Sequence, residues 1–338
     1  MSAKPLLLEI KNLDVNFYLD EGTVEAVQDV SLDIYQDYAL GIVGESGCGK
    51  SVLSQAIMRI VPRPGEITGG ELVYHGHNSH PVDIAKLDGT GKAIRAIRGN
   101  EIALILQEPM AALSPLYTVG NQIRDALFQH TSMSRNEARD YIIELLDQVG
   151  IPQPETRIDQ YPFELSGGLR QRVVIAMAIA CKPKLLIADE PTTALDVTIQ
   201  AQILKLFQEL KDSLEISIIF ISHDLAVISE IADEVAVMYN GRVVEKGPAS
   251  KVFAEPLHPY TVGLLKSVPK LGVKSRERLT VIEGSVPDPF MKYKGCAFHP
   301  RCSIREEVCT VQCPTLKTLE QEREVACFPI QGNTGGTE

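Results

Sequence analysis

The first part of the chain alternates hydrophobic and polar residues with the period of a β-strand. We expect short strands between residues 6 and 43, with apolar positions at Leu13, Val15, Phe17, Val27, Val30, Leu32 and Ile34. The run at residues 39–43 is apolar throughout and ends at a glycine, which predicts a buried strand. A helix should follow through Leu53, Ile57 and Ile60 and end before two prolines, Pro62 and Pro64.

The period changes in the middle of the chain. Residues 66–107 predict an edge hairpin, a short helix and a core strand at 102–106. From 108 to 180 no strong strand pattern occurs, and an amphipathic helix ends at Gly150 after the apolar positions Ile142, Leu145, Leu146 and Val149. We therefore expect a helical subdomain at about 108–180, inserted into an α/β core.

The core pattern then resumes and is followed by a tail of different composition. Residues 185–188 and 216–221 predict buried strands on either side of a helix at about 197–212. Asn240-Gly241 suits the positive φ angles of a tight hairpin turn. After about residue 250 the chain becomes rich in proline, cysteine and charge, and we expect a separate tail domain at 251–338.

Composition and charge exclude several functions. The 338 residues are 44% hydrophobic and 23% charged, which is ordinary for a globular protein. A formal charge of −11 argues against nucleic acid as a partner. The longest apolar stretch, at 173–181, is far shorter than the roughly 20 residues of a spanning helix, and Glu9 interrupts the apolar start too early for a signal peptide. These observations predict a protein kept in the cytosol.

The strongest chemical signal is a glycine-rich loop between a predicted strand and a predicted helix. It fits the pattern G-x-x-x-x-G-K-[ST] with Gly44, Glu45, Ser46, Gly47, Cys48, Gly49, Lys50 and Ser51. Glycines let backbone N–H groups surround phosphate at the positive end of a helix. Lys50 would then reach the β- and γ-phosphates, and the Ser51 hydroxyl would bind Mg²⁺.

Two acidic residues end the apolar strand at 185–188. Ligands bind beyond the carboxyl ends of parallel strands, so Asp189 can hold Mg²⁺ there. Glu190 is placed to polarise the water that attacks the γ-phosphate, which is a general-base role. A solvated helix N-cap is the alternative for such a pair, and the phosphate loop makes it the weaker one.

A second potential anion site lies about 115 residues beyond the phosphate loop. Leu165 is followed by Ser166, Gly167 and Gly168 and then by a predicted helix, which supplies a hydroxyl, flexible N–H groups and a helix dipole. By itself this is an ordinary serine-capped helix start. One chain cannot easily bring both sites to one γ-phosphate, whereas two chains packed head to tail can.

In this order of motifs the chain resembles a nucleotide-binding subunit of an ABC transporter, from about residue 6 to residue 250. The resemblance implies a P-loop nucleoside-triphosphatase core with an inserted helical subdomain, an antiparallel β subdomain and a small C-terminal extension. Position 169 is Leu where many family members have Gln. The implied functional residues besides those above are Gln107, which senses the γ-phosphate and Mg²⁺, His223 at the γ-phosphate, Asp196 at the dimer interface, and Phe17, or its neighbour Tyr18, on adenine.

The resemblance also implies partners. Two such subunits would sandwich two ATP molecules and pull on two transmembrane permease subunits that dock near residues 108–130, at the cytoplasmic face of the membrane. A related, non-identical second ATPase is favoured over a second copy of this chain. An extracytoplasmic binding protein would act indirectly and select the cargo. The alternatives are a soluble ABC-type ATPase, a simple P-loop kinase or GTPase, and a subunit that binds ATP only structurally.

The tail narrows the resemblance to one branch. His258-Pro259-Tyr260-Thr261 and the stretch at 295–302 resemble the C-terminal extension of dipeptide, oligopeptide and nickel-peptide importer ATPases. In that extension the resemblance implies a [4Fe-4S] cluster on Cys296, Cys302, Cys309 and Cys327. The spacing itself leaves zinc and free thiols open, and Cys313 is a fifth thiol nearby.

Overall fold

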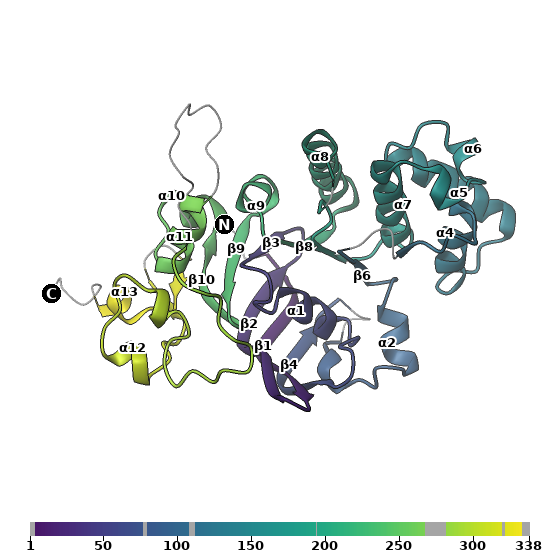
Figure 1. Ribbon diagram of the computed structural model, residues 1–338. Helices are drawn as coiled ribbons and strands as arrows, with labels where there is room; N and C mark the ends of the chain where they lie inside the picture. Colours follow the sequence, from purple (N-terminus) through teal and green to yellow (C-terminus); the bar gives the residue numbers. More distant parts are fainter. Residues whose placement is uncertain are drawn as a thin grey trace, which may run out of the picture. The chain divides into compact units, whose positions relative to one another are not determined.

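The computed structural model describes residues 4–76, 80–107, 112–193, 195–267, 282–319 and 322–332. The chain divides into two compact units. The first unit comprises residues 1–8, 34–38 and 73–221, and the second comprises 9–33, 39–72 and 222–338. Both units are drawn in Figure 1.

The first unit contains three parallel strands in the order β8-β7-β6. They are β6 (Ile102–Ile105), β7 (Leu185–Asp189) and β8 (Ser217–Ser222). Every residue of β7 and β8 is buried, as expected for strands covered on both faces. Around them lie β5 (Val82–Asp83), η1 (Ile84–Lys86), α2 (Lys92–Ile97) and α8 (Val197–Leu214). The predicted core strands and the helix after β7 are confirmed.

The same unit contains a group of helices that pack on one another (Figure 1). They are α4 (Val119–Phe128), α5 (Arg135–Gln148), α6 (Pro154–Arg157) and α7 (Gly167–Ile179), with the short turn η2 (Pro162–Glu164) between the last two. A capping box of Ser134 and Glu137 starts α5, whose apolar face is buried at Ile142, Leu145 and Leu146. No strand occurs in the described residues 112–180, as predicted; residues 108–111 lie outside the described part.

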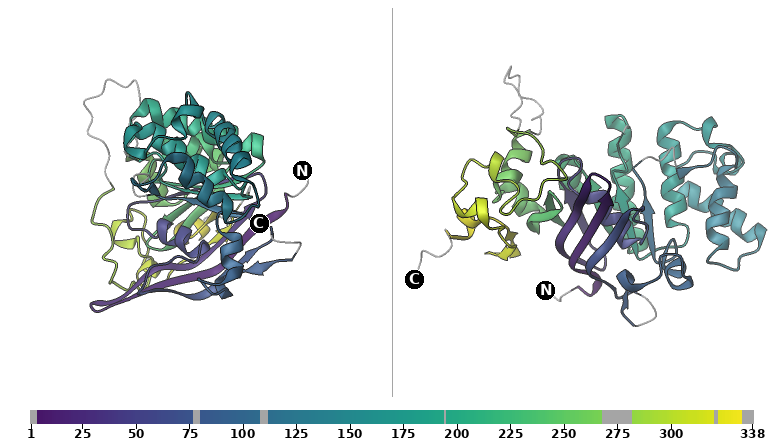
Figure 2. Two further views of the ribbon diagram at one scale, coloured as in Figure 1. Left: turned by 90° about the vertical axis from the view of Figure 1, so that its right-hand side faces the viewer. Right: turned by 60° about the horizontal axis from the view of Figure 1, so that its bottom comes forward.

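The second unit begins with an antiparallel ribbon. Strands β1 (Leu6–Leu19) and β2 (Gly22–Tyr35) run side by side, and β4 (Gly65–Tyr74) pairs on the other edge of β1 (Figure 2). The prediction of short strands was wrong here, because β1 and β2 are each 14 residues long. Only two residues connect them, so the pairing can run along their full length.

This unit also contains five strands of the eight-stranded sheet, in the order β11-β12-β10-β9-β3. They are β3 (Ala39–Val43), β9 (Glu234–Tyr239), β10 (Arg242–Pro248), β11 (Lys317–Thr318) and β12 (Glu324–Val325). The predicted turn between β9 and β10 is confirmed, since Asn240 and Gly241 have φ angles of 46° and 77°.

Helix α1 (Lys50–Ile57) follows β3 but is shorter than predicted. Ile60 lies outside the helix and is 41% exposed. Arg59 has a left-handed φ of 54°, and this single residue ends the helix before Pro62 is reached. Helix α9 (Leu225–Ile231) lies between β8 and β9 in the sequence.

The tail after residue 248 is built of short elements. They are α10 (Ala249–Ala254), α11 (Pro259–Ser267), η3 (His299–Arg301), α12 (Val308–Val311) and α13 (Phe328–Gly332), besides β11 and β12. Strand β12 pairs with β10 antiparallel, with Val325 opposite Glu245. The end of the tail is therefore part of the sheet that contains β3.

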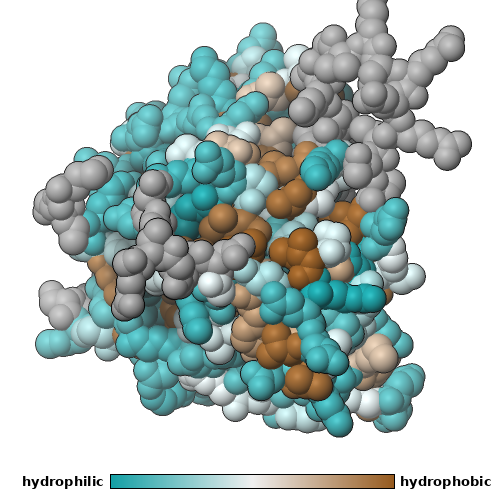
Figure 3. Space-filling model, turned by 90° about the vertical axis from the view of Figure 1, so that its left-hand side faces the viewer, coloured by the Kyte–Doolittle hydropathy of each residue, from teal (hydrophilic) through white to brown (hydrophobic). Residues whose placement is uncertain are grey.

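In the part of the chain that the structure describes, none of the helices combines the length and the apolar composition of a membrane-spanning segment. Figure 3 shows a face on which the hydrophobic groups are separated by hydrophilic ones.

Candidate nucleotide-binding site

The loop at residues 44–51 joins the buried strand β3 to α1, as predicted. Gly47 and Gly49 have φ angles of 80° and 103°, a region that favours glycine. A side chain at position 49 would place its Cβ 2.2 Å from the carbonyl oxygen of Ala26. Gly49 therefore permits both the turn and the close approach of the neighbouring strand.

Lys50 points back into this loop. Only 5% of the residue is exposed, and its Nζ donates hydrogen bonds to the carbonyl oxygens of Gly44 at 2.7 Å and Glu45 at 3.0 Å. Cys48 is also buried, and burial raises the pKa of its thiol. A lysine whose ammonium group is held by loop carbonyls is placed to exchange these contacts for phosphate oxygens.

Glu45 in the same loop is held by two residues of the tail. Its backbone N–H donates to the Tyr260 hydroxyl at 2.7 Å. Its carboxylate accepts two hydrogen bonds from Arg301, at 2.7 and 3.0 Å. Neither contact could be predicted from local sequence, because 215 and 256 positions separate the partners.

The first unit brings Gln107 and the acidic pair together. Asp189 ends β7 and is 3% exposed. Glu190 follows with a left-handed φ of 48°, and its carboxylate accepts hydrogen bonds from Gln107 Nε2 at 3.1 Å and Thr193 Oγ1 at 3.0 Å. A strained backbone at a non-glycine residue is typical of functional positions. The side chain of Glu190 is thus fixed by two neighbours at the carboxyl end of the strand.

Ser166 caps α7, and its Oγ accepts a hydrogen bond from Leu169 N–H at 3.4 Å. The helix starts two residues earlier than predicted, at Gly167. A Cβ at position 168 would lie 2.9 Å from Ile199, whereas a Cβ at 167 would meet no atom of the described residues within 4 Å. Packing within this chain therefore explains the glycine at 168 but not the one at 167.

The other predicted residues lie at strand and helix ends. Asp196 is exposed and caps α8 by accepting from Ile199 N–H at 3.0 Å; Ala194 nearby is outside the described residues. His223 is exposed directly after β8. On β1, Phe17 is half-buried beside Gly65, and Tyr18 is 50% exposed.

The five tail cysteines are all free thiols. Burial, and to a smaller extent the neighbouring thiols, raises the pKa of Cys296 to about 12 and that of Cys327 to about 11. Within the described residues, no group of three or more His, Cys, Asp or Glu side chains is arranged to hold a metal ion. The prediction of a four-thiolate cluster site on Cys296, Cys302, Cys309 and Cys327 is thus not supported by the side-chain arrangement, because thiols that lie in the same region do not converge on one point.

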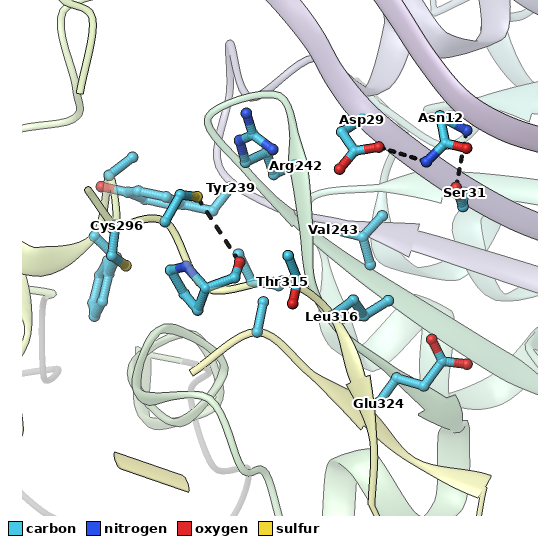
Figure 4. A pocket seen from close by; sticks show the side chains of 16 residues that line it. Asn12, Asp29, Ser31, Tyr239, Arg242, Val243, Cys296, Thr315, Leu316 and Glu324 are labelled. Carbon is cyan, nitrogen blue, oxygen red and sulfur yellow. Dashed lines mark hydrogen bonds between the residues drawn. The ribbon is translucent and has the colours of Figure 1, made fainter. Parts of the chain in front are cut away.

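A cavity of about 470 Å³ lies between the tail and the strands of the second unit. Cys296 and Tyr239 line one end, and Asn12 and Asp29 line the other (Figure 4). The Asn12 amide donates to Asp29 at 2.7 Å, so these polar groups are paired with each other.

Two features define the class of P-loop nucleoside triphosphatases. One is a glycine-rich loop with a buried lysine after a parallel strand, and the other is an acid pair at the end of another parallel strand. Comparison with known proteins narrows this class. Residues 27–193 match the ABC transporter family, and residues 244–309 match the C-terminal region of the oligopeptide/dipeptide transporter family.

Full-length relatives extend the match. A putative peptide import ATP-binding protein of Brucella ovis is 48% identical, with 98% of this chain and 99% of that protein covered. The dipeptide transport ATP-binding protein DppD of Bacillus subtilis is 47% identical, with 95% and 94% covered. The dimeric structure of MJ0796, a bacterial ABC transporter cassette, superposes with a TM-score of 0.63 at 26% identity over 72% of this chain and 99% of that chain.

The chain therefore belongs to the ABC transporter family, and it carries the C-terminal region of the oligopeptide/dipeptide branch. It is an ATP hydrolase with the ABC ATPase fold. The predicted fold class and enzyme class are confirmed.

Proposed function

We propose that this chain is the ATP-binding and ATP-hydrolysing subunit of an importer for dipeptides or oligopeptides. Two observations carry the proposal. Lys50 is hydrogen-bonded inside the phosphate loop. The Glu190 carboxylate is oriented by Gln107 and Thr193 at the end of β7. The peptide cargo is supported by relatives named for peptide, dipeptide and oligopeptide transport.

In this proposal the loop at residues 44–51 binds the triphosphate. Lys50 exchanges its bonds to loop carbonyls for bonds to the β- and γ-phosphates. The oxygen donors of Ser51, Asp189 and Gln107 are of the type that Mg²⁺ prefers, and the ion would neutralise charge on the phosphates. Phe17 stacks on the adenine ring.

Glu190 acts as the general base. Its carboxylate accepts hydrogen bonds from Gln107 and Thr193, which orient it without protonating it. His223 contacts the γ-phosphate in the transition state. In each hydrolysis event, a carboxylate oxygen of Glu190 accepts one proton from the attacking water.

A second ATPase subunit completes the site. Ser166, Gly167 and Gly168 of one subunit, with the N–H groups that start α7, close over the γ-phosphate held by the other. Gly167 supports this step, because packing against the described residues of this chain does not require a glycine at this position. Asp196 lies at the same interface, and we favour a related, non-identical chain as the second subunit.

Closure of the two ATPases drives two transmembrane permease subunits. The chain works as a peripheral protein at the cytoplasmic face of the membrane, and residues of the helical part near 108–130 contact the permeases. Residues 108–111 of this segment lie outside the described part. The extracytoplasmic binding protein selects the cargo, and nucleic acid has no part. The domain boundaries we propose are 1–250 for the ATPase and 251–338 for the extension.

The test is a pair of variants in the assembled transporter. Glu190→Gln should retain ATP affinity and lose hydrolysis by about 100-fold or more, because only the base is removed. Lys50→Ala should lose ATP affinity itself. Unchanged turnover of Glu190→Gln would mean that the base is wrongly assigned.

The iron–sulfur cluster of the tail is a separate, finer proposal. It is supported by five free thiols between residues 296 and 327 and by the match to the oligopeptide/dipeptide C-terminal region, not by their present arrangement. Protein purified without oxygen should be brown and contain acid-labile sulfide in about the same amount as iron. Colourless protein with one zinc ion would exclude the cluster.

A further inference from the structure

The tail contacts the phosphate loop at Glu45, a charged residue. An acid on a loop that binds a triphosphate is electrostatically unfavourable, because like charges repel strongly where water is partly excluded. The sequence therefore raises the question of what makes this acid tolerable.

Arg301 forms an ion pair with Glu45. Its Nη1 and Nη2 bind the two carboxylate oxygens at 2.7 and 3.0 Å, the paired geometry of a strong guanidinium–carboxylate bridge. The Arg301 side chain is 4% exposed and that of Glu45 is 23% exposed, so solvent screens the bridge only weakly. The bridge also raises the pKa of Arg301 above its ordinary value.

The rest of the guanidinium is held so that it cannot turn away. Nε donates to the carbonyl oxygen of Glu283 at 3.1 Å, and Nη2 donates to that of Ile282 at 3.3 Å. The group also lies 5.9 Å from the ring centres of Tyr239 and Phe298. Arg301 is thus a fixed positive charge presented to the loop by the tail.

The loop backbone has a separate support. The Tyr260 hydroxyl accepts the Glu45 N–H at 2.7 Å, and the Tyr260 ring packs 4.6 Å from that of Tyr239. Since Tyr260 positions the backbone, the contribution that remains for Arg301 is its charge.

We propose that Arg301 neutralises Glu45 and thereby keeps the phosphate loop receptive to ATP. Arg301 is a positioning and charge-compensating residue rather than a catalytic one. The extension that carries the cysteines is then also a determinant of nucleotide affinity. This inference rests on the proposed role of residues 44–51 in binding ATP.

The experiment measures ATP affinity of the full-length chain in Arg301→Ala, Glu45→Gln and the double variant. Arg301→Ala should weaken ATP binding by about tenfold at low salt, because it leaves an uncompensated carboxylate beside the triphosphate. Arg301→Ala should cost much less affinity when it is made in Glu45→Gln than when it is made in the parent, because the carboxylate that it would leave uncompensated is then absent. A purely structural role would not give this difference.

Two further measurements, a salt dependence and a control variant, complete the test. Removal of the Arg301 side chain opens the Glu45 carboxylate to solvent, so the loss in Arg301→Ala should shrink at about 0.3 M salt, which screens exposed charge. Arg305→Ala removes an exposed positive charge from the same tail and should bind ATP as the parent does. If Arg301→Ala does not fold, Arg301→Gln replaces it, with the same expected loss, because the charge is removed while part of the side chain is kept.

Parental affinity in Arg301→Ala would overturn the inference, and so would an equal loss when Arg301→Ala is made in Glu45→Gln. Lys50→Ala separates this failure from failure of the proposed function. If Lys50→Ala binds ATP normally, residues 44–51 are not the ATP site; if it does not bind while Arg301→Ala does, only the inference fails.

Discussion

His258 is the residue in the tail whose burial has the clearest consequence for pH. It is 1% exposed, and its Nδ1 accepts a hydrogen bond from the Tyr260 N–H at 3.1 Å. Burial lowers its pKa from 6.5 to about 3, so the folded protein keeps it neutral. The unfolded chain binds a proton below pH 6.5, and stability is therefore lost as the pH falls from 6.5 towards 3.

This yields a prediction for His258→Asn, whose side-chain oxygen can still accept from Tyr260. Between pH 7 and pH 5 the parent should lose about 2 kcal/mol more unfolding free energy than the variant does, since the asparagine does not titrate. Urea unfolding of both full-length chains at the two pH values measures the difference. Parallel losses in the two proteins would show that His258 does not titrate on unfolding.

Single-residue contacts were predictable only where neighbouring sequence defines them. The loop glycines, the position of Lys50 after them and the acid pair at the end of β7 follow from patterns of a few residues. The contacts of Tyr260 and Arg301 to Glu45 do not follow from such patterns. Tyr260 lies 215 positions and Arg301 lies 256 positions beyond Glu45, and no local pattern links residues so far apart. The same holds for the hydrogen bond between Gln107 and Glu190. Glu190 was predicted from the local acid pair and Gln107 from the resemblance, and no local pattern joins the two.

At the scale of elements, the strands with a continuous apolar sequence were predicted, and the two-residue strands of the tail were not. Strands β3, β7 and β8 are short, nearly continuous apolar runs, which are typical of strands buried on both faces. Strand β12 has only two residues, and their own propensity cannot define a strand. Its position depends on what surrounds it.

The support for β12 is a buried ion pair between Arg323 and Glu245. The Glu245 carboxylate is fully buried and accepts hydrogen bonds from Arg323 at 3.0 Å and from the backbone N–H groups of Leu257 and His258. Arg323 also donates to the carbonyl oxygen of Glu255. This network joins β10, the start of α11 and β12.

Arg323→Met should therefore cost about 3 kcal/mol of unfolding free energy, because it leaves the buried carboxylate without its cation. The amide of Ala326, which donates to Val244 O at 2.9 Å, should exchange its hydrogen faster in the variant. The double variant Glu245→Gln, Arg323→Met should recover part of the loss. Unchanged exchange at Ala326 would mean that pairing of β12 does not depend on the ion pair.

At the scale of the whole molecule, the deciding question is whether the start of α7 serves a second subunit. Among the described residues nothing lies within 4 Å of a Cβ at position 167, and an acid in the first turn of a helix is favoured by the helix dipole. Gly167→Asp should therefore leave the melting temperature of the isolated chain unchanged or slightly raised. The isolated chain should also bind ATP as the parent does, because residues 44–51 are intact.

In the assembled transporter the same substitution should lower ATP turnover by about tenfold or more, since it places a negative charge against the γ-phosphate held by the other subunit. Asn136→Asp is the matched control, because it adds the same charge near the start of α5 at an exposed position. Normal turnover in Gly167→Asp would mean that each chain closes its own site. Loss of ATP binding by the isolated chain would contradict the sandwich equally, because residue 167 would then act within one subunit.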